Sequence, residues 1–333
     1  MTTAARTPVP ARTPIGRVAV IGGGTSCEHD VSLASAAGVA EALLAGGHDV
    51  VRLTIDPEGV WRDGGDRPIG LAGAVHVLRS CAVAVPVVHG PGGEDGTLAA
   101  LLDLAGVPYV GSGVGAGALA MDKWVTKLVA EALGLATAPG VLLTRASAAA
   151  YAVDHPVVVK PVAAGSSHGV SLVREQAELA AALDAAFALD DRVLVEDVVV
   201  GREIDVAVLA SGAELLVSPA LEIRVDGLFD FEAKYGGGAD FVVPAPLSST
   251  EQKALESAAL AMFTALGCRG VARIDFFLTE AGPVLNEVNT MPGFTAHSQV
   301  PQMFAAAGID YVALVDRLVR DAVAGRATPR AAA

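Results

Sequence analysis

The stretch that decides the fold is RIDFF at residues 273–277 followed by NEVN at residues 286–289, with the turn-forming sequence TEAGP at 279–283 between them. Two short runs of this kind joined by a tight turn are typical of a β-hairpin. Because alternate side chains of a strand share one face, each run presents two polar side chains on the same side of the hairpin. These side chains are Arg273, Asp275, Glu287 and Asn289.

The polar face of this hairpin is suited to a metal ion. It gathers two carboxylates, an amide oxygen and a guanidinium, while the neighbouring positions are apolar and predict a core-facing side. Oxygen ligands suit Mg²⁺ or Mn²⁺ rather than zinc, and Mg²⁺ shares its coordination shell with nucleotide phosphates. A half-exposed hairpin with a solvated polar face is the alternative that spacing alone leaves open. The apolar positions are Ile274, Phe276, Val284 and Val288.

The sequence around the hairpin resembles a known family. The string RIDFFL, followed by LNEVNTMPGFTAHS, resembles the C-terminal signature of the D-alanine:D-alanine ligases in the ATP-grasp superfamily. Further blocks resemble that family's other motifs in the same order, so the resemblance extends from about residue 17 to residue 322. They are GGGTSCEHDVS at 22–32, HGPGGEDG at 89–96, GSG…MDK at 111–123, VVKPVAAGSSHGV at 158–170 and EAKYGGGADFVVPA at 232–245.

Composition bounds the class of protein. A chain of 333 residues with 52% hydrophobic content has room for two or three domains and a sizeable core. The formal net charge of −14, without any Lys/Arg-rich run, argues against a nucleic-acid partner. The three cysteines lack metal-site spacing and are odd in number, which fits a reducing cytoplasm. Because no segment resembles a signal peptide or a membrane span, we expect a cytoplasmic protein with no membrane partner.

The first part of the chain predicts a small α/β domain at residues 17–120. A strand, a helix and a second strand form a βαβ opening, and a further buried strand and helix complete a parallel sheet with flanking helices. These elements are expected at 17–21, 32–45, 49–55, 81–88 and 96–104.

The rest of the chain predicts two more domains, at 121–200 and 201–324, with tails at 1–16 and 325–333. The resemblance implies that they are the halves of an ATP-grasp module, which pinches a nucleotide between antiparallel sheets. The central half is expected to have helices at 123–133 and 176–188 and strands at 141–144, 157–160, 170–173 and 193–196. The last half is expected to begin with segments 203–210 and 214–223 and to carry a helix at 250–266 before the hairpin.

Two further features bear on a nucleotide site. The stretch GSSHG at 165–169 has the composition of a phosphate-covering hairpin, because glycine allows close backbone approach and N–H groups bind phosphate oxygens. It is not a Walker loop, and an ordinary flexible turn is the alternative. Lys160 follows three valines, an awkward place for a charge unless it faces a ligand at the strand end. The loop GGGTS at 22–26 lacks the third glycine of a dinucleotide-binding fingerprint.

The resemblance implies a nucleotide-binding set. Lys123 and Lys160 are expected to contact the phosphates of ATP, joined by Lys234 from an ordered loop. Glu196 is expected to accept a hydrogen bond from the adenine amine, and Glu203 to bind the ribose hydroxyls. The implied ligands of the metal ion are Asp275, Glu287 and Asn289.

The resemblance also implies a site for a first D-amino acid. Glu28 is expected to hold its ammonium group, in a hydrogen-bonded network with Ser166 and Tyr235, and His89 lies beside its carboxylate. From the residues alone, a glutamate near a helix start and a histidine after a buried strand have purely structural roles as alternatives.

The activity that the resemblance implies is ATP-dependent ligation of two D-alanines for peptidoglycan biosynthesis. One carboxylate attacks the γ-phosphate of ATP to give an acyl phosphate, and the amine of the second D-alanine attacks that acyl phosphate. Arg273 and the backbone N–H of Gly293 are expected to stabilise the oxyanion of the second step. Relatives are usually homodimers, so a homodimer is implied as well. A nicotinamide oxidoreductase built on the first domain is the alternative from another class.

Specificity for the second substrate is left open at Ser298 and Gln299. Relatives that add D-alanine usually carry Leu or Met at the second of these positions. The Gln299 amide either turns to solvent or backbone, which leaves D-alanine preferred, or bonds a hydroxyl, which predicts some D-serine in the product. Tyr235 keeps the D-alanine pattern of the family, so D-lactate is the weaker alternative.

Overall fold

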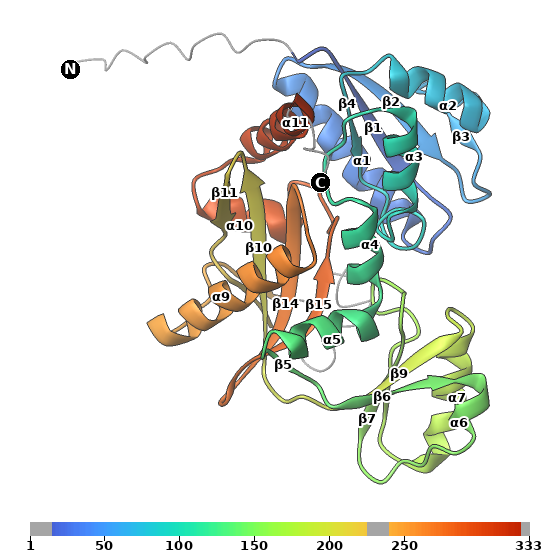
Figure 1. Cartoon of the computed structure of the whole chain (residues 1–333), viewed down its shortest axis with the longest axis vertical. Helices are drawn as coiled ribbons and strands as arrows, with labels where there is room; N and C mark the ends of the chain where they lie inside the picture. Colours follow the sequence, from blue (N-terminus) through green and yellow to red (C-terminus); the bar gives the residue numbers. More distant parts are fainter. Residues whose placement is uncertain (1–14, 225–239, 328–333) are drawn as a thin grey trace, which may run out of the picture.

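The structure, a computed structural model, describes residues 15–224 and 240–327 and contains three sheets (Figure 1). The first sheet has the order β3-β2-β1-β4, in which β1 pairs in parallel with β2 and β4, as expected, and β3 adds an antiparallel edge. Its strands are β1 (Arg17–Gly23), β2 (Asp49–Ile55), β3 (Trp61–Arg62) and β4 (Val83–Pro86).

Helices cover both faces of this first sheet. On one face α1 (His29–Ala45) packs on β1 and β2, and on the other face lie α2 (Gly70–Arg79) and α3 (Thr97–Ala105). The last helix, α11 (Tyr311–Ala327), returns to pack on α1 and β4, so the two ends of the described chain share one apolar core (Figure 1). No helix in either described range is both long and apolar enough to cross a membrane.

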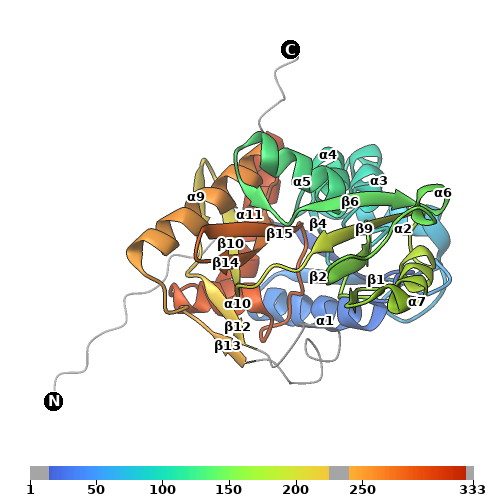
Figure 2. The ribbon, with the colours of Figure 1, turned by 90° about the horizontal axis from the view of Figure 1, so that it is seen from below.

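The seven-stranded sheet lies between two layers of helices, and Figure 2 shows these layers on opposite sides of it. Side chains of β10 alternate, so Ile204, Val206 and Val208 face one core while Ala207 and Leu209 face the other. The first core is covered by α4 (Val114–Met121), α5 (Lys123–Ala132) and α9 (Ser249–Ala265), and the second by α10 (Gln299–Ala306) and α11. The strands are β13 (Asp240–Val242), β12 (Leu221–Arg224), β10 (Arg202–Ser211), β14 (Val271–Thr279), β15 (Gly282–Asn289) and β5 (Ala136–Thr137), with β11 (Glu214–Val217) paired to β10.

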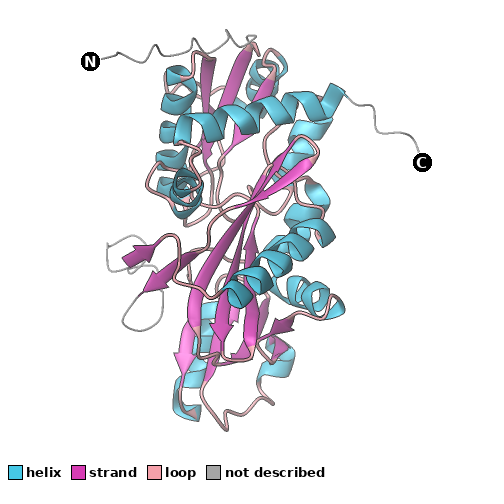
Figure 3. Ribbon diagram, turned by 90° about the vertical axis from the view of Figure 1, so that its left-hand side faces the viewer, coloured by secondary structure: helices cyan, strands magenta, loops and turns pink. Residues whose placement is uncertain are grey.

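The third sheet is antiparallel throughout and has the order β6-β9-β7-β8. α6 (Arg145–Ala148) and α7 (Gln176–Phe187) pack against it. Figure 3 shows the three sheets following one another along the molecule, with the seven-stranded sheet in the middle. The strands of the third sheet are β6 (Gly140–Thr144), β7 (Val157–Pro161), β8 (Ser171–Val173) and β9 (Arg192–Asp197).

Three details differ from the sequence-based expectation. Segment 214–223 is two strands, β11 and β12, because Ser218-Pro219-Ala220 interrupts it and proline cannot donate to a ladder. The helix at the start of the predicted central domain, α5, packs on β15 and β5 of the seven-stranded sheet. The short strand β5 also belongs to the seven-stranded sheet, where it pairs in parallel with β15. The predicted domain boundaries at 120 and 200 stay predictions.

The hairpin contains a β-bulge that the alternation rule missed. β14 and β15 pair as far as Thr279 and Gly282, so the turn consists of residues 280–281 only. The register shifts between Asp275 and Phe276, and Leu285, 2% exposed, takes the core position predicted for Val284, which is half-buried. A bulge inserts one residue into one strand and reverses its alternation beyond that point. The four polar side chains lie on the site side of the bulge and still share a face.

Candidate active site

A cavity of about 500 Å³ collects most of the predicted site residues. Its lining comes from the start of α1, the loop after β4, the start of α5, the glycine-rich loop, the hairpin and the loop that leads into α10. The predicted residues that line it are Glu28, His89, Lys123, Ser166, Arg273, Glu287, Asn289, Gly293, Ser298 and Gln299. Asp275 lies directly behind this lining, whereas Lys234 and Tyr235 lie outside the described residues.

Glu28 provides a buried carboxylate at one wall of the cavity. Its side chain is buried, and Ser166 Oγ donates a hydrogen bond to its Oε1, which is the contact expected between these two residues. No donor from residues 15–224 or 240–327 reaches Glu28 Oε2. A buried carboxylate oxygen without a donor is costly, so this oxygen is suited to a cationic group of a ligand.

Backbone conformation makes this close approach feasible. A Cβ atom at Gly165 would lie 2.1 Å from Glu28 Oε2, and one at Gly90 would lie 2.7 Å from it. Both distances are below van der Waals contact, so a side chain at either position would displace the carboxylate of Glu28. Ser166 and Ser167 adopt φ values of 49° and 58°, a left-handed conformation that is uncommon for residues other than glycine. Such outliers cluster at ligand-binding sites.

His89 lines the cavity, but both of its ring nitrogens bind protein groups. Nδ1 lies 2.9 Å from the carbonyl oxygen of Met291, to which it donates, and Nε2 lies 2.9 Å from Ser35 Oγ. The Ser35 hydroxyl in turn accepts from the backbone N–H of Phe294. Burial lowers the pKa of His89, which favours the neutral ring. In this arrangement His89 holds the 291–294 loop against α1, and its predicted contact with a substrate carboxylate stays a prediction.

Glu94 is a site residue to which the sequence analysis gave no role. Its carboxylate accepts from the backbone N–H of Gly90 at 2.8 Å and from that of Met291 at 3.0 Å. It therefore ties the loop after β4 to the loop after β15. Burial, and next the nearby charge of Glu28, raise the pKa of Glu94 to about 8.

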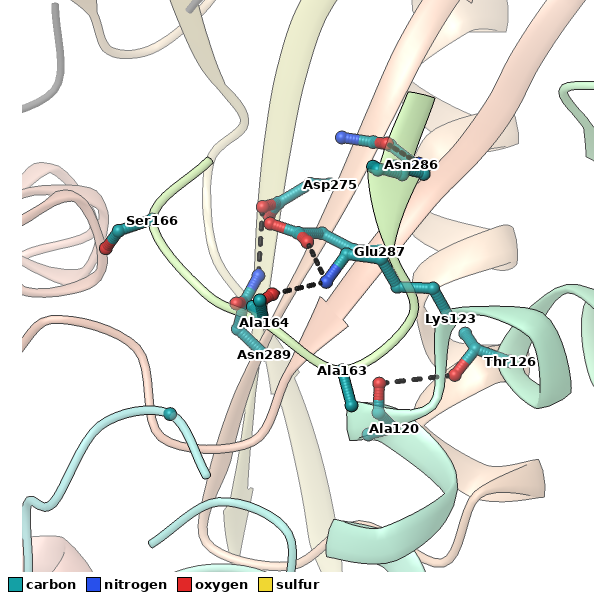
Figure 4. Close-up of polar contacts among 12 residues, drawn as sticks. Ala120, Lys123, Thr126, Ala163, Ala164, Ser166, Asp275, Asn286, Glu287 and Asn289 are labelled. Atoms are coloured by element: carbon teal, nitrogen blue, oxygen red, sulfur yellow. Dashed lines mark hydrogen bonds and ion pairs between the residues drawn. The ribbon is translucent and has the colours of Figure 1, made fainter. Parts of the chain in front are cut away.

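The polar face of the hairpin is internally paired. Arg273 donates from Nε and Nη2 to the two oxygens of Asp275, at 2.7 Å each, and Asn289 Nδ2 donates to Asp275 Oδ2 at 3.0 Å. Lys123 Nζ lies between Glu287 Oε2, at 3.3 Å, and the carbonyl oxygen of Ala164, at 2.8 Å (Figure 4). Burial opposes the charge on Arg273, but the carboxylates around it raise its pKa above the ordinary value.

These residues fit a divalent cation. Asp275 and Glu287 stand opposite each other in the β14–β15 register, and Asn289 adds an amide, so the donors are all oxygen. No cluster of three or more His, Cys, Asp or Glu side chains with metal-site geometry occurs in the described ranges. The set of two carboxylates and one amide is therefore the candidate, and such a small set leaves positions for phosphate oxygens and water.

A second polar cluster lies between α5 and β9, away from the cavity lining. Glu196 is buried between Lys160, whose Nζ lies 2.5 Å from Oε2, and Lys127, whose Nζ donates to Oε1. Lys160 also lies 3.5 Å from Asn286 Oδ1, and Lys127 also donates to the carbonyl of Ala138. Burial opposes the ionisation of Glu196, but the charges of the two lysines hold the pKa of this carboxyl group below its ordinary value. Lys127, 3% exposed, was missed by the sequence analysis.

Glu203 lies near the start of β10, a central strand of the seven-stranded sheet, opposite Phe277 and Ile223, and does not line the cavity. Ser298 precedes α10 and its Oγ accepts from the backbone N–H of Thr295 at 3.0 Å. This contact shapes the loop that carries Gly293 into the cavity wall.

An antiparallel sheet and a largely antiparallel sheet with lysines between them, the second carrying the oxygen-ligand hairpin, are the arrangement of an ATP-grasp protein. Residues 17–75 and 66–112 match the family described as D-ala D-ala ligase N-terminus, and residues 129–320 match D-ala D-ala ligase C-terminus. The chain belongs to the D-ala D-ala ligase family. Ligases of this family use ATP and a divalent metal ion.

Individual relatives agree with this assignment. The D-alanine–D-alanine ligase of Mycolicibacterium gilvum is 40% identical over 92% of this chain and 97% of its own length. Among solved structures, VanG D-Ala:D-Ser ligase from Enterococcus faecalis has a TM-score of 0.81 and 33% identity, over 92% of this chain and 99% of its own. D-alanyl-alanine synthetase A from Vibrio cholerae has a TM-score of 0.83 and 29% identity, over 94% and 100%.

Proposed function

We propose that this ligase joins two D-alanines to D-alanyl-D-alanine with conversion of ATP to ADP, in the cytoplasm and for peptidoglycan biosynthesis. The observation that carries the proposal is the cavity in which a buried carboxylate, Glu28, and a buried guanidinium, Arg273, line the same space. An amino acid presents an ammonium and a carboxylate, and these two protein groups complement them. The family assignment agrees with this pairing.

In the first step a carboxylate oxygen of the first D-alanine attacks the γ-phosphorus of ATP, and ADP leaves. Glu28 holds the ammonium group through Oε2 and keeps that substrate fixed, with Ser166 orienting the carboxylate of Glu28. Lys123 places a positive charge next to Glu287 at the reacting end. Mg²⁺ held by Asp275, Glu287 and Asn289 would offset the phosphate charge, and Mn²⁺ fits the same donors.

In the second step the neutral amine of the second D-alanine attacks the acyl carbon. A C–N bond forms, the C–O bond to phosphate breaks, and the proton that the amine loses passes to the departing phosphate or to solvent. Arg273 and Gly293, whose backbone N–H is the second expected donor, line the cavity in which the oxyanion develops. Preorganised donors of this kind commonly contribute about 10²- to 10³-fold each.

A second candidate is ligation of D-alanine to D-serine. VanG, a D-Ala:D-Ser ligase, resembles this chain over nearly its whole length. The fold therefore accommodates D-alanine or D-serine as the second substrate. Side chains around the second subsite decide between them.

The test is ADP release with ATP and Mg²⁺ over a panel of D-alanine, D-serine, D-lactate and L-alanine, with products identified by mass. D-Alanine alone should support turnover and give D-alanyl-D-alanine, while L-alanine alone should not. Turnover that ignores D-alanine contradicts the proposal. Saturable NADH binding would instead favour the oxidoreductase. Sedimentation of the same sample tests the implied homodimer.

A further inference from the structure

Gln299, the first residue of α10, makes two partly buried contacts that engage both polar atoms of its amide. Its Oε1 accepts from Arg273 Nη1 at 2.5 Å, and its Nε2 donates to Asp205 Oδ2 at 2.8 Å. The two partners are of opposite polarity, so they fix which end of the amide faces which residue. Gln299 therefore turns neither to solvent nor to backbone, which was the first sequence-based alternative, and the second, a bond to a substrate hydroxyl, stays a prediction.

Asp205 is the second member of this cluster. It lies on β10 opposite Asp275 of β14, on the face covered by α10, and is 2% exposed. Its Oδ2 is 3.4 Å from Arg273 Nε and accepts the Gln299 amide. A buried carboxylate persists only when it is paired and hydrogen-bonded, and Arg273 and Gln299 meet that need.

Arg273 is held from two sides for different reasons. Asp275 binds its Nε and Nη2, but Asp275 is also a proposed metal ligand, so its oxygens are shared between two tasks. Gln299 binds Nη1 and has no task at the metal. Gln299 thus holds the guanidinium through a contact that the proposed metal site does not share.

We propose that Gln299 and Asp205 form a brace that orients Arg273 for the oxyanion, so that Gln299 acts through Arg273 and not on the side chain of the second substrate. The proposal rests on the proposed function, because it assumes the ligation step. It makes both residues positioning residues, and it predicts that the Gln299 amide does not select D-serine.

The test compares Gln299→Met with wild type in assays that contain both D-alanine and D-serine. Met nearly preserves volume but cannot accept from Arg273, so kcat should fall about tenfold while KM for ATP stays constant. The D-serine share of the product should not change. Asp205→Asn keeps the shape and weakens the brace, so its kcat should fall less. The matched control is Gln302→Met on the same helix, because the Gln302 amide donates to the His297 carbonyl and not to Asp205.

A double-mutant cycle separates a brace from general destabilisation. In an Arg273→Lys background, Gln299→Met should cost little further activity, because the group that it orients is already gone. Multiplying losses would overturn the brace, as would an unchanged kcat in Gln299→Met. A reduced D-serine share at unchanged rate would show instead that the amide binds a hydroxyl. If wild type itself makes no dipeptide, the proposed function fails, which is visible before any variant is made.

Discussion

The hairpin and the start of α1 form two walls of the cavity, and the carboxylates on these walls have different partners. On the hairpin, Asp275 is paired with Arg273 and Glu287 with Lys123. At the start of α1, Glu28 has a neutral donor, Ser166, and its Oε2 has no donor from the described ranges. The α1 wall is therefore preorganised for a cationic group of a ligand, whereas the hairpin must exchange internal partners when it binds one. This difference ranks the expected effects of substitution.

The largest effect is expected for Glu28→Gln. It removes the charge that faces the substrate ammonium. Losing one partner of a buried charge pair commonly costs about 2–5 kcal/mol, so kcat/KM for D-alanine should fall roughly 10²- to 10³-fold, with KM for ATP little changed. Glu41→Gln, an exposed position on the same helix, is the control. Comparable losses in both variants would remove the distinction between the walls.

The hairpin variants should be milder and should respond to metal. Asp275→Asn and Glu287→Gln each remove one charged ligand, so turnover at low Mg²⁺ should fall about 10- to 100-fold and recover partly as Mg²⁺ is raised. Arg273→Ala should not recover, because its proposed role is on the substrate oxyanion. Glu280→Gln in the exposed hairpin turn is the control. Metal rescue of Arg273→Ala would contradict the assigned roles.

Lys127→Met probes the cluster around Glu196. Lys127 helps to neutralise and orient this carboxylate, which is expected to bind the adenine amine. Its loss should raise KM for ATP about tenfold and leave KM for D-alanine unchanged. Lys253→Met, exposed on α9, is the control. An equal rise in both KM values would argue that Lys127 serves overall stability only.

The last effect concerns the free energy of unfolding instead of turnover, through pH and Glu94. Its pKa is about 8 in the fold, against about 4.3 in an unfolded chain, and Glu28 and Glu287 face it. Between these values the folded state holds a proton that the unfolded state has lost. The free energy of unfolding should therefore fall as pH rises, by at most about 1.4 kcal/mol per pH unit.

Urea unfolding of wild type and Glu94→Gln across this pH range measures the effect. The variant should lack this part of the slope, whatever its absolute stability. Parallel slopes in the two proteins would mean that Glu94 is already ionised in the fold.

The sequence predicted the parts of the site that follow from alternation along a strand and from local turn chemistry. The polar face of the hairpin belongs here. The contact of Ser166 with Glu28 was implied by the family resemblance and not by these local patterns. The bulge was missed because no single residue type specifies it. As a result Leu285, and not Val284, packs in the core. The packing of α5 on the seven-stranded sheet depends on tertiary contacts that local patterns do not encode.

Some missed residues did leave a signal. Lys127 follows Lys123 by four positions on one helix, which places the two ammonium groups on neighbouring parts of one face. Asp205 interrupts an apolar strand, where a charge needs a partner. Its partner could not be predicted, because Gln299 is distant in sequence and meets Asp205 only through the packing of α10 on the sheet.

The most direct test of the account is transfer of oxygen from substrate to phosphate. D-Alanine labelled with ¹⁸O in both carboxylate oxygens is converted with unlabelled ATP, and the phosphate and dipeptide are weighed by mass spectrometry. If the carboxylate attacks the γ-phosphorus and the amine then displaces phosphate, each phosphate should carry one ¹⁸O and the new amide carbonyl should retain one. Phosphate without label, formed together with the dipeptide, would contradict the acyl-phosphate route and the roles given to both walls of the cavity.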